Sequence, residues 1–346
     1  MASGTPLWLC QREAAAVSEL RWNPLLEEWV VTATHRQERT FFPPADYCPL
    51  CPTRPGGFPT EVPGGDYDVA VLENRFPSFH ANPPEPAVSG DELTPVRPAQ
   101  GICEVVLYSP RHDATLVSLG RETVYKLVQV WRDRYEELGA RPGIQYVFVF
   151  ENRGAEVGVT LTHPHGQIYA FPYVPPVPQR ELASMRKHWQ QTGRCLLCDL
   201  LRRETEDGVR LVSSFGGFRA LVPFYARFPY EVHIVAQRHL GSLSELSEDE
   251  GWDLAGAVHD VVTRYDAMYA SPMPYMMVVH QSPTDCAANY FYHHFHIEFY
   301  PLRRAADKLK YRAGCESGAG TFITDALPED WAAQLRRIGT GGVAQP

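Results

Sequence analysis

The stretch Leu161-Thr162-His163-Pro164-His165-Gly166-Gln167-Ile168-Tyr169 places two imidazoles and a carboxamide at alternate positions. Alternate side chains of an extended backbone share one face, so we expect His163, His165 and Gln167 to project together. Pro164 has no amide hydrogen, which predicts a sheet edge, a bulge or a strand end here. A neutral imidazole can attack phosphorus, and a carboxamide can donate to an oxygen that gains negative charge. Two histidines on one strand can also bind a metal, and we assign one histidine to each role.

The composition restricts the class of protein. The chain has 346 residues, a net charge of −9, 44% hydrophobic residues and 21% charged residues. This length allows one large domain or two ordinary ones, and the composition is typical of a soluble globular protein. An acidic balance without a dense Lys/Arg run argues against a nucleic-acid binder. We find no apolar run as long as a membrane span and no signal-like N-terminus, so we expect a cytoplasmic protein with no membrane partner.

Four of the eight cysteines form two CxxC pairs, Cys48–Cys51 and Cys195–Cys198. In a reducing compartment such pairs more often bind metal or carry out redox chemistry than form structural disulfides. The scattered cysteines are interpreted as small buried hydrophobic residues. They are Cys10, Cys103, Cys286 and Cys315.

Landmarks of the first half of the chain recur in the same order in the second half. Each half has a CxxC pair, an Arg-His dipeptide, a helical pattern, a strand and a His-x-His motif. The histidine of the dipeptide precedes the motif by 51 residues in the first half (163 − 112) and by 55 in the second (294 − 239). This recurrence indicates an internal duplication.

The duplication predicts an α+β fold of two repeats. Each repeat would be an antiparallel sheet carrying one long helix, and the two sheets would join into one extended sheet. We expect residues 1–178 to form the first repeat, with the proline-rich run 171–178 as the linker. Residues 179–338 would form the second repeat, and residues 339–346 a flexible tail.

Each repeat supplies two cysteines and two histidines, the ligand set of a closed tetrahedral zinc site. Such a site leaves no position for water, so we expect both to be structural. The first set is Cys48, Cys51, His112 and His163, and the second is Cys195, Cys198, His239 and His294. Zinc on His163 would fix the strand two residues from His165. In the second repeat Glu298 stands where the first has Gln167, so we do not expect a second active site there.

These residues resemble the galactose-1-phosphate uridylyltransferase family, duplicated members of the histidine-triad superfamily. The run 163–167 matches the family's active-site signature, and the similarity extends from about residue 20 to 338. The resemblance implies a ping-pong reaction in which His165 attacks the α-phosphorus of UDP-glucose and releases glucose 1-phosphate. Galactose 1-phosphate then takes the uridylyl group from the histidine. Gln167 would donate to a phosphoryl oxygen, and His163 would be a zinc ligand.

The resemblance also implies a set of substrate-binding residues. Near the phosphates and the uridine these are Arg36, Arg39, Asn74, Phe76, Asn152, Gly158, Thr160 and Gln167. On spacing alone, the two arginines would suit an anion clamp, but an ordinary solvated turn is favoured; the resemblance places them near the phosphates instead. A late segment that reaches the sugar phosphate, in the family often across a dimer, is represented by Lys310, Tyr311, Ala313 and Glu316. The implied partners are therefore UDP-glucose, a hexose 1-phosphate and a second copy of the chain.

The sequence departs from the well-known bacterial members in three places. Cys315 replaces a tyrosine, and the segment 317–322 has no counterpart of their hexose-binding glutamine. The second metal site of those members does not use the cysteine pair. Its ligands match Glu181, His280, His296 and Glu298 of this chain, and Glu298 stands where those members have a histidine. We favour zinc on the second cysteine set, with iron on the carboxylate set as the alternative.

Other functions are possible on the same scaffold. One is a nucleotide-sugar phosphorylase or adenylyltransferase of the ADP-glucose type, and another is a histidine-triad nucleotide hydrolase. A third is a zinc-stapled nucleotide-binding module without chemistry. The duplication and the late segment favour transfer over hydrolysis, because a second phosphorylated substrate needs its own site.

Overall fold

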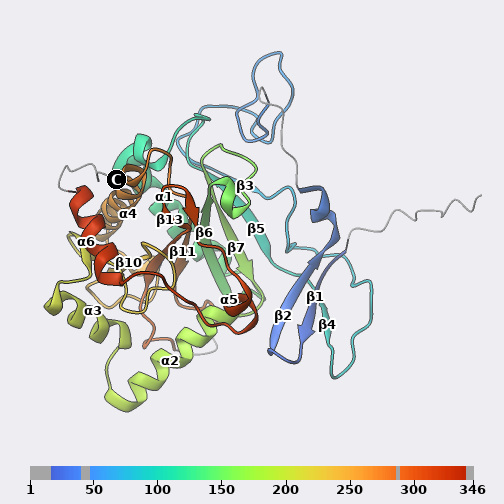
Figure 1. The fold of residues 1–346 in the computed structure, drawn as a ribbon. Helices are drawn as coiled ribbons and strands as arrows, with labels where there is room; N and C mark the ends of the chain where they lie inside the picture. The colour runs from blue at the N-terminus through green and yellow to red at the C-terminus, as the bar shows by residue number, and fades with distance from the viewer. Residues whose placement is uncertain (1–16, 40–46, 286–288, 340–346) are drawn as a thin grey trace, which may run out of the picture.

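The computed structural model describes residues 17–39, 47–285 and 289–339, and it is built around one antiparallel sheet of nine strands (Figure 1). The strand order is β3-β5-β7-β6-β11-β12-β10-β9-β8. In that order the strands are β3 (Ala70–Glu73), β5 (Ile102–Leu107), β7 (His165–Phe171), β6 (Tyr146–Arg153), β11 (Tyr275–His280), β12 (His296–Pro301), β10 (Val232–Ala236), β9 (Phe218–Leu221) and β8 (Leu211–Phe215). An α+β fold with one extended sheet, as predicted, is confirmed.

The two halves of the chain meet where β6 pairs with β11. The pairing is antiparallel and runs from Tyr275 opposite Arg153 to Val278 opposite Phe150. On either side of this seam the next strand is the His-x-His strand, β7 in one half and β12 in the other. The order of equivalent strands is thus mirrored about the seam, which is the arrangement that a duplicated unit produces around a two-fold axis.

One face of the sheet is covered by the two long helices, α1 (Leu116–Gly139) and α4 (Glu248–Met268), which also pack against each other. Both helices begin with a capping box, formed by Thr115 and Ser118 in α1 and by Ser247 and Glu250 in α4. The core between the helices and the sheet includes alternate residues of β7, such as Ile168. The intervening residues of β7 therefore point to the opposite face.

The remaining elements lie around this core. The second repeat adds α2 (Pro176–Thr192), α3 (Leu196–Asp207), α5 (Gly314–Gly318) and α6 (Pro328–Gly339). Short 3-10 helices are η1 (Thr34–Arg39), η2 (Ala155–Val157) and η3 (Leu243–Glu245). Two small sheets contain β1 (Ser18–Asn23), β2 (Glu28–Ala33) and β4 (Val96–Pro98), and β13 (Arg303–Ala305) and β14 (Lys308–Leu309).

The predicted linker is wrong at both ends. Strand β7 continues to Phe171, and α2 already begins at Pro176, so only residues 172–175 lie between the two elements. A helix tolerates proline in its first turn because the missing amide has no helical partner there. Of the predicted tail, Gly339 ends α6, and residues 340–346 lie outside the described residues.

The scattered cysteines differ in burial. Cys103 is fully buried, as predicted, whereas Cys315 is exposed, so that prediction is wrong for Cys315. Cys315 lies in α5, a single short turn of helix after the small sheet of β13 and β14, where no core covers it. Cys10 and Cys286 lie outside the described residues.

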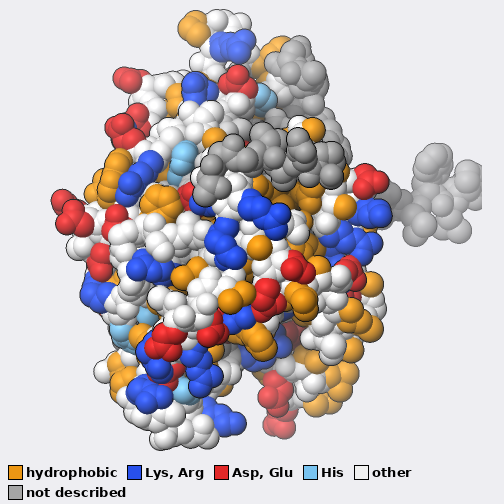
Figure 2. Space-filling model, turned by 60° about the vertical axis from the view of Figure 1, so that its left-hand side comes forward, with side chains coloured by type: hydrophobic (Ala, Val, Ile, Leu, Met, Phe, Trp, Pro, Cys, Tyr) orange, Lys and Arg blue, Asp and Glu red, His pale blue; other side chains and the backbone are white. Residues whose placement is uncertain are grey.

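The surface agrees with the expected charge pattern. On the face drawn in Figure 2, acidic and basic side chains alternate without a large region of one sign. None of the helices in the described part of the chain combines the length and apolar character needed to cross a bilayer.

Candidate active site and metal clusters

A cavity of about 430 Å³ lies in the first repeat, on the side of the sheet opposite α1 and α4. The elements around it are η1, β3 and its following turn, the loop after β6, and the start of β7. Most of the residues expected to bind nucleotide line this cavity. They are Arg36, Asn74, Phe76, Asn152, Gly158, Thr160, His165 and Gln167.

His165 begins β7 and is held in one tautomer. Its Nδ1 lies 2.7 Å from the backbone oxygen of His163, which can only accept, so the proton must be on Nδ1. Nε2 then carries the lone pair. Burial lowers the pKa of His165 below the ordinary imidazole value, so the ring is neutral near pH 7. A neutral imidazole with a free lone pair is the nucleophilic form.

Gln167 is two residues further along the same face. Its side-chain oxygen accepts from Asn74 Nδ2 and from the hydroxyl of Tyr169, each at 3.4 Å. Both contacts use the oxygen, which orients the amide nitrogen as the donor toward a ligand. Asn74 is fixed in turn, because its oxygen accepts from the backbone amide of Phe76 at 2.9 Å.

Arg36 is anchored beside this pair. Its Nη1 donates to the backbone oxygen of Phe76 at 2.9 Å and to Ser78 Oγ at 2.6 Å, and lies 3.4 Å from the hydroxyl of Tyr169. Its guanidinium group is therefore a fixed positive charge on the cavity wall. The side chain of Arg39 lies outside the described part of the structure.

The late segment forms its own cluster. Lys310 Nζ donates to Glu316 Oε1 at 2.9 Å, and the backbone amide of Ala313 donates to Glu316 Oε2 at 3.1 Å. Tyr311 is 70% exposed. Lys310, Ala313 and Glu316 come together, and none of the four residues lines the cavity that contains His165.

The first cysteine set comes together beside the cavity. The ligand atoms of Cys48, Cys51, His112 and His163 all lie within 4.8 Å of one another. His163 Nε2 lies 2.8 Å from the backbone oxygen of Ser109, so Nε2 donates and Nδ1 faces the sulfur atoms. Two thiols and two imidazole nitrogens at this separation fit a tetrahedral zinc ion, with the carbonyl as the outer partner that orients the histidine.

The second cysteine set repeats this geometry. Cys195, Cys198, His239 and His294 also have their ligand atoms within 4.8 Å of one another. His294 Nε2 donates to the backbone oxygen of Ala236 at 2.9 Å, and His239 Nε2 donates to that of Phe291 at 2.8 Å. In both histidines Nδ1 faces sulfur. This set therefore fits zinc as well as the first does.

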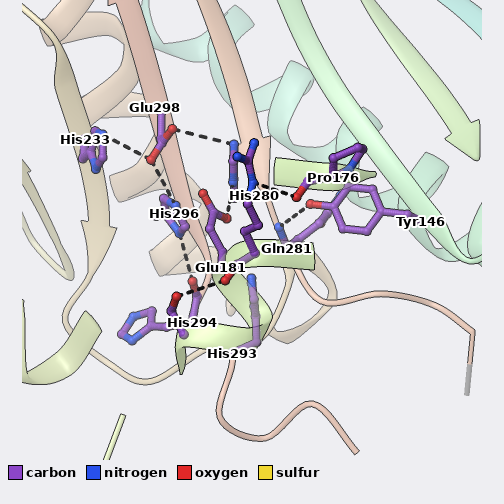
Figure 3. Close-up of polar contacts among 12 residues, drawn as sticks. Tyr146, Pro176, Glu181, His233, His280, Gln281, His293, His294, His296 and Glu298 are labelled. Carbon is purple, nitrogen blue, oxygen red and sulfur yellow. Dashed lines mark hydrogen bonds and ion pairs between the residues drawn. The ribbon is translucent and has the colours of Figure 1, made fainter. Parts of the chain in front are cut away.

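The carboxylate set is also assembled in part, so the two sets that the sequence posed as alternatives coexist (Figure 3). Ligand atoms of Glu181, His280 and His296 lie within 4.8 Å of one another. Glu181 Oε2 lies 2.6 Å from His280 Nδ1. Glu298, the fourth member proposed from the sequence, does not belong to this group.

Glu298 adjoins this group, with its Oε2 3.8 Å from His280 Nε2, and it also contacts side chains outside the group. Its Oε1 lies 3.2 Å from His233 Nε2 and 3.4 Å from His296 Nε2. Its Oε2 accepts from Arg227 at 3.3 Å and from the hydroxyl of Tyr300. These cationic and hydroxyl partners compensate the buried carboxylate without a metal.

Sequence reasoning missed several residues at these sites. Arg75 and Glu61 line the cavity and form an ion pair at 2.9 Å, although Glu61 lies in a stretch that read only as a Pro/Gly-rich loop. His233 and Arg227 were also missed. For His233 a signal existed, since it is the polar residue of an otherwise apolar strand. For Glu61 no spacing pointed to the site.

Comparison with known proteins gives one family over most of the chain. The model of the N-terminal domain of galactose-1-phosphate uridyl transferase matches residues 10–175, and that of the C-terminal domain matches residues 181–340. The chain is 42% identical to a galactose-1-phosphate uridylyltransferase of Thermotoga maritima, covering 92% of this chain and 98% of the relative. It is 33% identical to the enzyme of that name from Rattus norvegicus, covering 93% and 88% respectively.

Comparison with solved structures agrees with this family. A uridylyltransferase structure superposes with a TM-score of 0.83 at 35% identity, covering 93% of this chain and 98% of that one. An ADP-glucose phosphorylase from Arabidopsis thaliana superposes with a TM-score of 0.69 at 24% identity, covering 92% and 98%, and shares the fold.

Proposed function

Because this chain belongs to the galactose-1-phosphate uridylyltransferase family, we propose that it transfers a uridylyl group from UDP-glucose to galactose 1-phosphate through His165. The observation that carries the proposal is the state of His165, a neutral imidazole with its lone pair on Nε2, lining a cavity next to Gln167. Such a group suits a covalent nucleotidyl transfer.

In the first half-reaction, Nε2 of His165 attacks the α-phosphorus of UDP-glucose. The bond from that phosphorus to the bridging oxygen breaks, and glucose 1-phosphate leaves with the electron pair. The ring becomes positively charged, since Nδ1 keeps its proton. The hydrogen bond from Nδ1 to the His163 carbonyl strengthens as this charge develops. In the second half-reaction a phosphate oxygen of galactose 1-phosphate attacks, and the P–N bond breaks to restore the neutral ring.

Gln167 supports both transition states. Its amide donates to a phosphoryl oxygen, where negative charge concentrates during each attack. Arg36 adds a fixed positive charge on the same wall of the cavity. Asn74 and Phe76 hold the uridine, and Asn152, Gly158 and Thr160 hold the rest of the nucleotide.

The acceptor site is completed by a second copy of the chain. Lys310, Tyr311, Ala313 and Glu316 line no part of the cavity around His165 in their own chain, which supports their use by a neighbour. We therefore propose a homodimer, active in the cytoplasm, whose late segments reach the hexose phosphate of the partner site.

The metal of each cysteine set is zinc. The donor atoms and the carbonyl partners of the histidines support this assignment for both sets. Four protein ligands leave no position for substrate, so each ion would be structural. In the first repeat it would hold His163, whose backbone oxygen accepts from His165. The two repeats, joined through residues 172–175, would thus hold one zinc each.

Mass spectrometry of the intact protein tests the proposal. After mixing with UDP-glucose, the chain should gain one uridylyl group, and peptide mapping should place it on His165. ADP-glucose, tested separately, should give no comparable adduct. A stable adenylyl adduct in place of the uridylyl one would assign the ADP-glucose chemistry instead, and the absence of any adduct would overturn the proposal.

A further inference from the structure

The residue between His165 and Gln167 is a glycine that faces the buried side of the sheet. A Cβ atom on Gly166 would lie 2.4 Å from the hydroxyl oxygen of Tyr108 and 3.2 Å from its Cζ. The first distance is far below van der Waals contact. Gly166 does not have a positive φ, so its backbone would accept any residue. The tyrosine hydroxyl is the nearest obstacle to a side chain here, and the backbone oxygen of Phe150, at 3.3 Å, is a second and milder one.

Tyr108 contacts the nucleophile strand at a second point. Its backbone amide donates to the backbone oxygen of Pro164 at 3.1 Å. Strand β5, which ends just before Tyr108, pairs with β7 along its length, with Leu107 opposite His165. Tyr108 therefore supports the segment from Pro164 to Gly166 from below, while His165 faces the cavity above.

The hydroxyl of Tyr108 is held in place by two further buried residues. It donates to Glu151 Oε2 at 2.8 Å, and the hydroxyl of Tyr275 donates to Glu151 Oε1, also at 2.8 Å. Tyr108, Glu151 and Tyr275 are 1%, 5% and 0% exposed. Glu151 comes from β6 and Tyr275 from β11, so this cluster of three residues crosses the seam between the repeats.

The cluster of Tyr108, Glu151 and Tyr275 does more than fill space in the core. Burying a carboxyl group costs free energy that an apolar side chain would not incur, even where hydroxyl groups satisfy it. The carboxyl group of Glu151 orients both tyrosine side chains, because each of its two oxygens accepts a hydrogen bond from one hydroxyl. Adjacent to it, Arg153 forms a bidentate ion pair with Asp266 at 2.7 and 3.0 Å, which restrains the same strand.

We propose that Tyr108, held by Glu151 and Tyr275, is a positioning residue that sets where the backbone of His165 and Gln167 lies relative to the cavity. This inference rests on the proposed function, because it concerns the same strand. A nucleophile must lie about 3–3.5 Å from the reacting atom, and a misplacement of about 1 Å can cost on the order of a hundredfold in rate.

A compensation experiment tests this role. Gly166→Ala should push the strand away from Tyr108 and slow formation of the uridylyl adduct about a hundredfold in single turnovers with saturating UDP-glucose. Tyr108→Phe removes the oxygen that clashes, so the double variant Gly166→Ala/Tyr108→Phe should form the adduct at least about tenfold faster than Gly166→Ala alone. A double variant no faster than Gly166→Ala would overturn the proposal.

Tyr108→Phe alone covers the case in which Gly166→Ala does not fold. It should slow adduct formation at saturating UDP-glucose while leaving the concentration for half-maximal rate nearly unchanged, because binding groups are untouched. Tyr265→Phe is the matched control, since Tyr265 is equally buried and its hydroxyl donates to the Tyr230 carbonyl at 2.7 Å, away from β7. It should lower the melting temperature without slowing the adduct.

The results distinguish a failure of the proposed function from a failure of the positioning role of Tyr108. If the unaltered chain forms no adduct, the proposed function is overturned, and the positioning role falls with it. If the unaltered chain forms the adduct and Tyr108→Phe leaves its rate unchanged, or slows it no more than Tyr265→Phe does, only the positioning role is overturned.

Discussion

The two His-x-His strands occupy equivalent places on either side of the seam, and their backbones hold the second histidine in the same way. Nδ1 of His165 lies 2.7 Å from the His163 carbonyl, and Nδ1 of His296 lies 3.0 Å from that of His294. In both strands the first histidine belongs to a Cys₂His₂ set. The surroundings differ. His165 lines an open cavity, whereas His296 is 3% exposed and faces Glu298 and Glu181 (Figure 3).

Under the proposed function, this difference would separate a reactive imidazole from an inert one. Burial lowers the pKa of His165, so its lone pair is free. Burial acts in the same direction on His296, but the carboxylates of Glu298 and Glu181 outweigh it and raise the pKa of His296. A ring that shares its Nε2 with a carboxylate cannot attack phosphorus. The second repeat therefore has the histidine, but His296 lines no such cavity, and Glu298 stands in place of the neutral Gln167.

The largest effect should come from the nucleophile itself. His165→Gly should reduce adduct formation by a factor of about 10⁴ or more, because none of the other described residues that line the cavity has an imidazole. The variant should retain its zinc and its melting temperature within a few degrees. His296→Gln is the matched change in the second repeat, and it should still form the adduct. Uridylylation of the His165→Gly variant at any residue would contradict the assignment, as measured by peptide mapping.

The cysteine sets should have unequal consequences for activity. Replacing Cys195 and Cys198 with serine should lower the zinc content by one ion per chain and lower the melting temperature. Structural zinc contributes about 10–16 kcal/mol in small zinc-folded peptides, so even a fraction of that is measurable. Replacing Glu181 and His280 with glutamine should leave the zinc content intact. Metal analysis that gives the reverse pattern would assign the second metal to the carboxylate set.

The equivalent change in the first repeat sharpens the contrast. Serine at Cys48 and Cys51 should also remove one zinc per chain, but in addition should slow adduct formation, since His163 is then free and its carbonyl orients His165. Equal adduct rates in both cysteine variants would show that the first zinc does not support the nucleophile.

Gln167 of β7 and Glu298 of β12 occupy equivalent positions but differ in charge. Gln167→Ala should slow both half-reactions by about 10²–10³, because one donor to the developing negative charge is lost, while the adduct stays detectable. Gln167→Glu copies the second repeat and should be slower still near neutral pH, since a carboxylate repels the phosphate. Rapid-quench measurement of each half-reaction checks this, and unchanged rates in Gln167→Ala would assign the residue to packing.

The smallest effect concerns pH. The rate of adduct formation should fall as the pH drops, because protonated His165 has no lone pair. Since burial lowers the pKa of this group, the midpoint should lie below the ordinary imidazole value of about 6.5. Gln167→Glu should move the midpoint upward, as a carboxylate favours the charged ring. A midpoint above 6.5 for the unaltered chain would contradict the environment described for His165.

The features that the sequence predicts correctly follow from local spacing or from the duplication, which also indicates which distant cysteines and histidines come together. The shared face of His165 and Gln167 follows from the period of a strand, and the CxxC pairs place two thiols in one turn. The prediction that His163 projects with them is wrong, because the strand begins only at His165 and His163 joins the first cysteine set. Tyr108, by contrast, meets Glu151 across 43 residues, and Tyr275 meets Glu151 across 124. No periodicity in one segment indicates which residue of another will lie beneath it. The contact of Glu298 with Arg227, across 71 residues, is unpredictable for the same reason.

The seam between β6 and β11 has a consequence for the chain as a whole. Two equivalent strands that run antiparallel form an isologous contact, of the kind that two identical molecules make with each other. A separate first repeat would expose the edge of β6, a row of unpaired amides and carbonyls, one strand away from His165. Covalent connection through residues 172–175 keeps the effective concentration of the pairing strand high whatever the amount of protein. Strand β6, which lies next to the strand of His165, thus has β11 of the second repeat as a permanent partner.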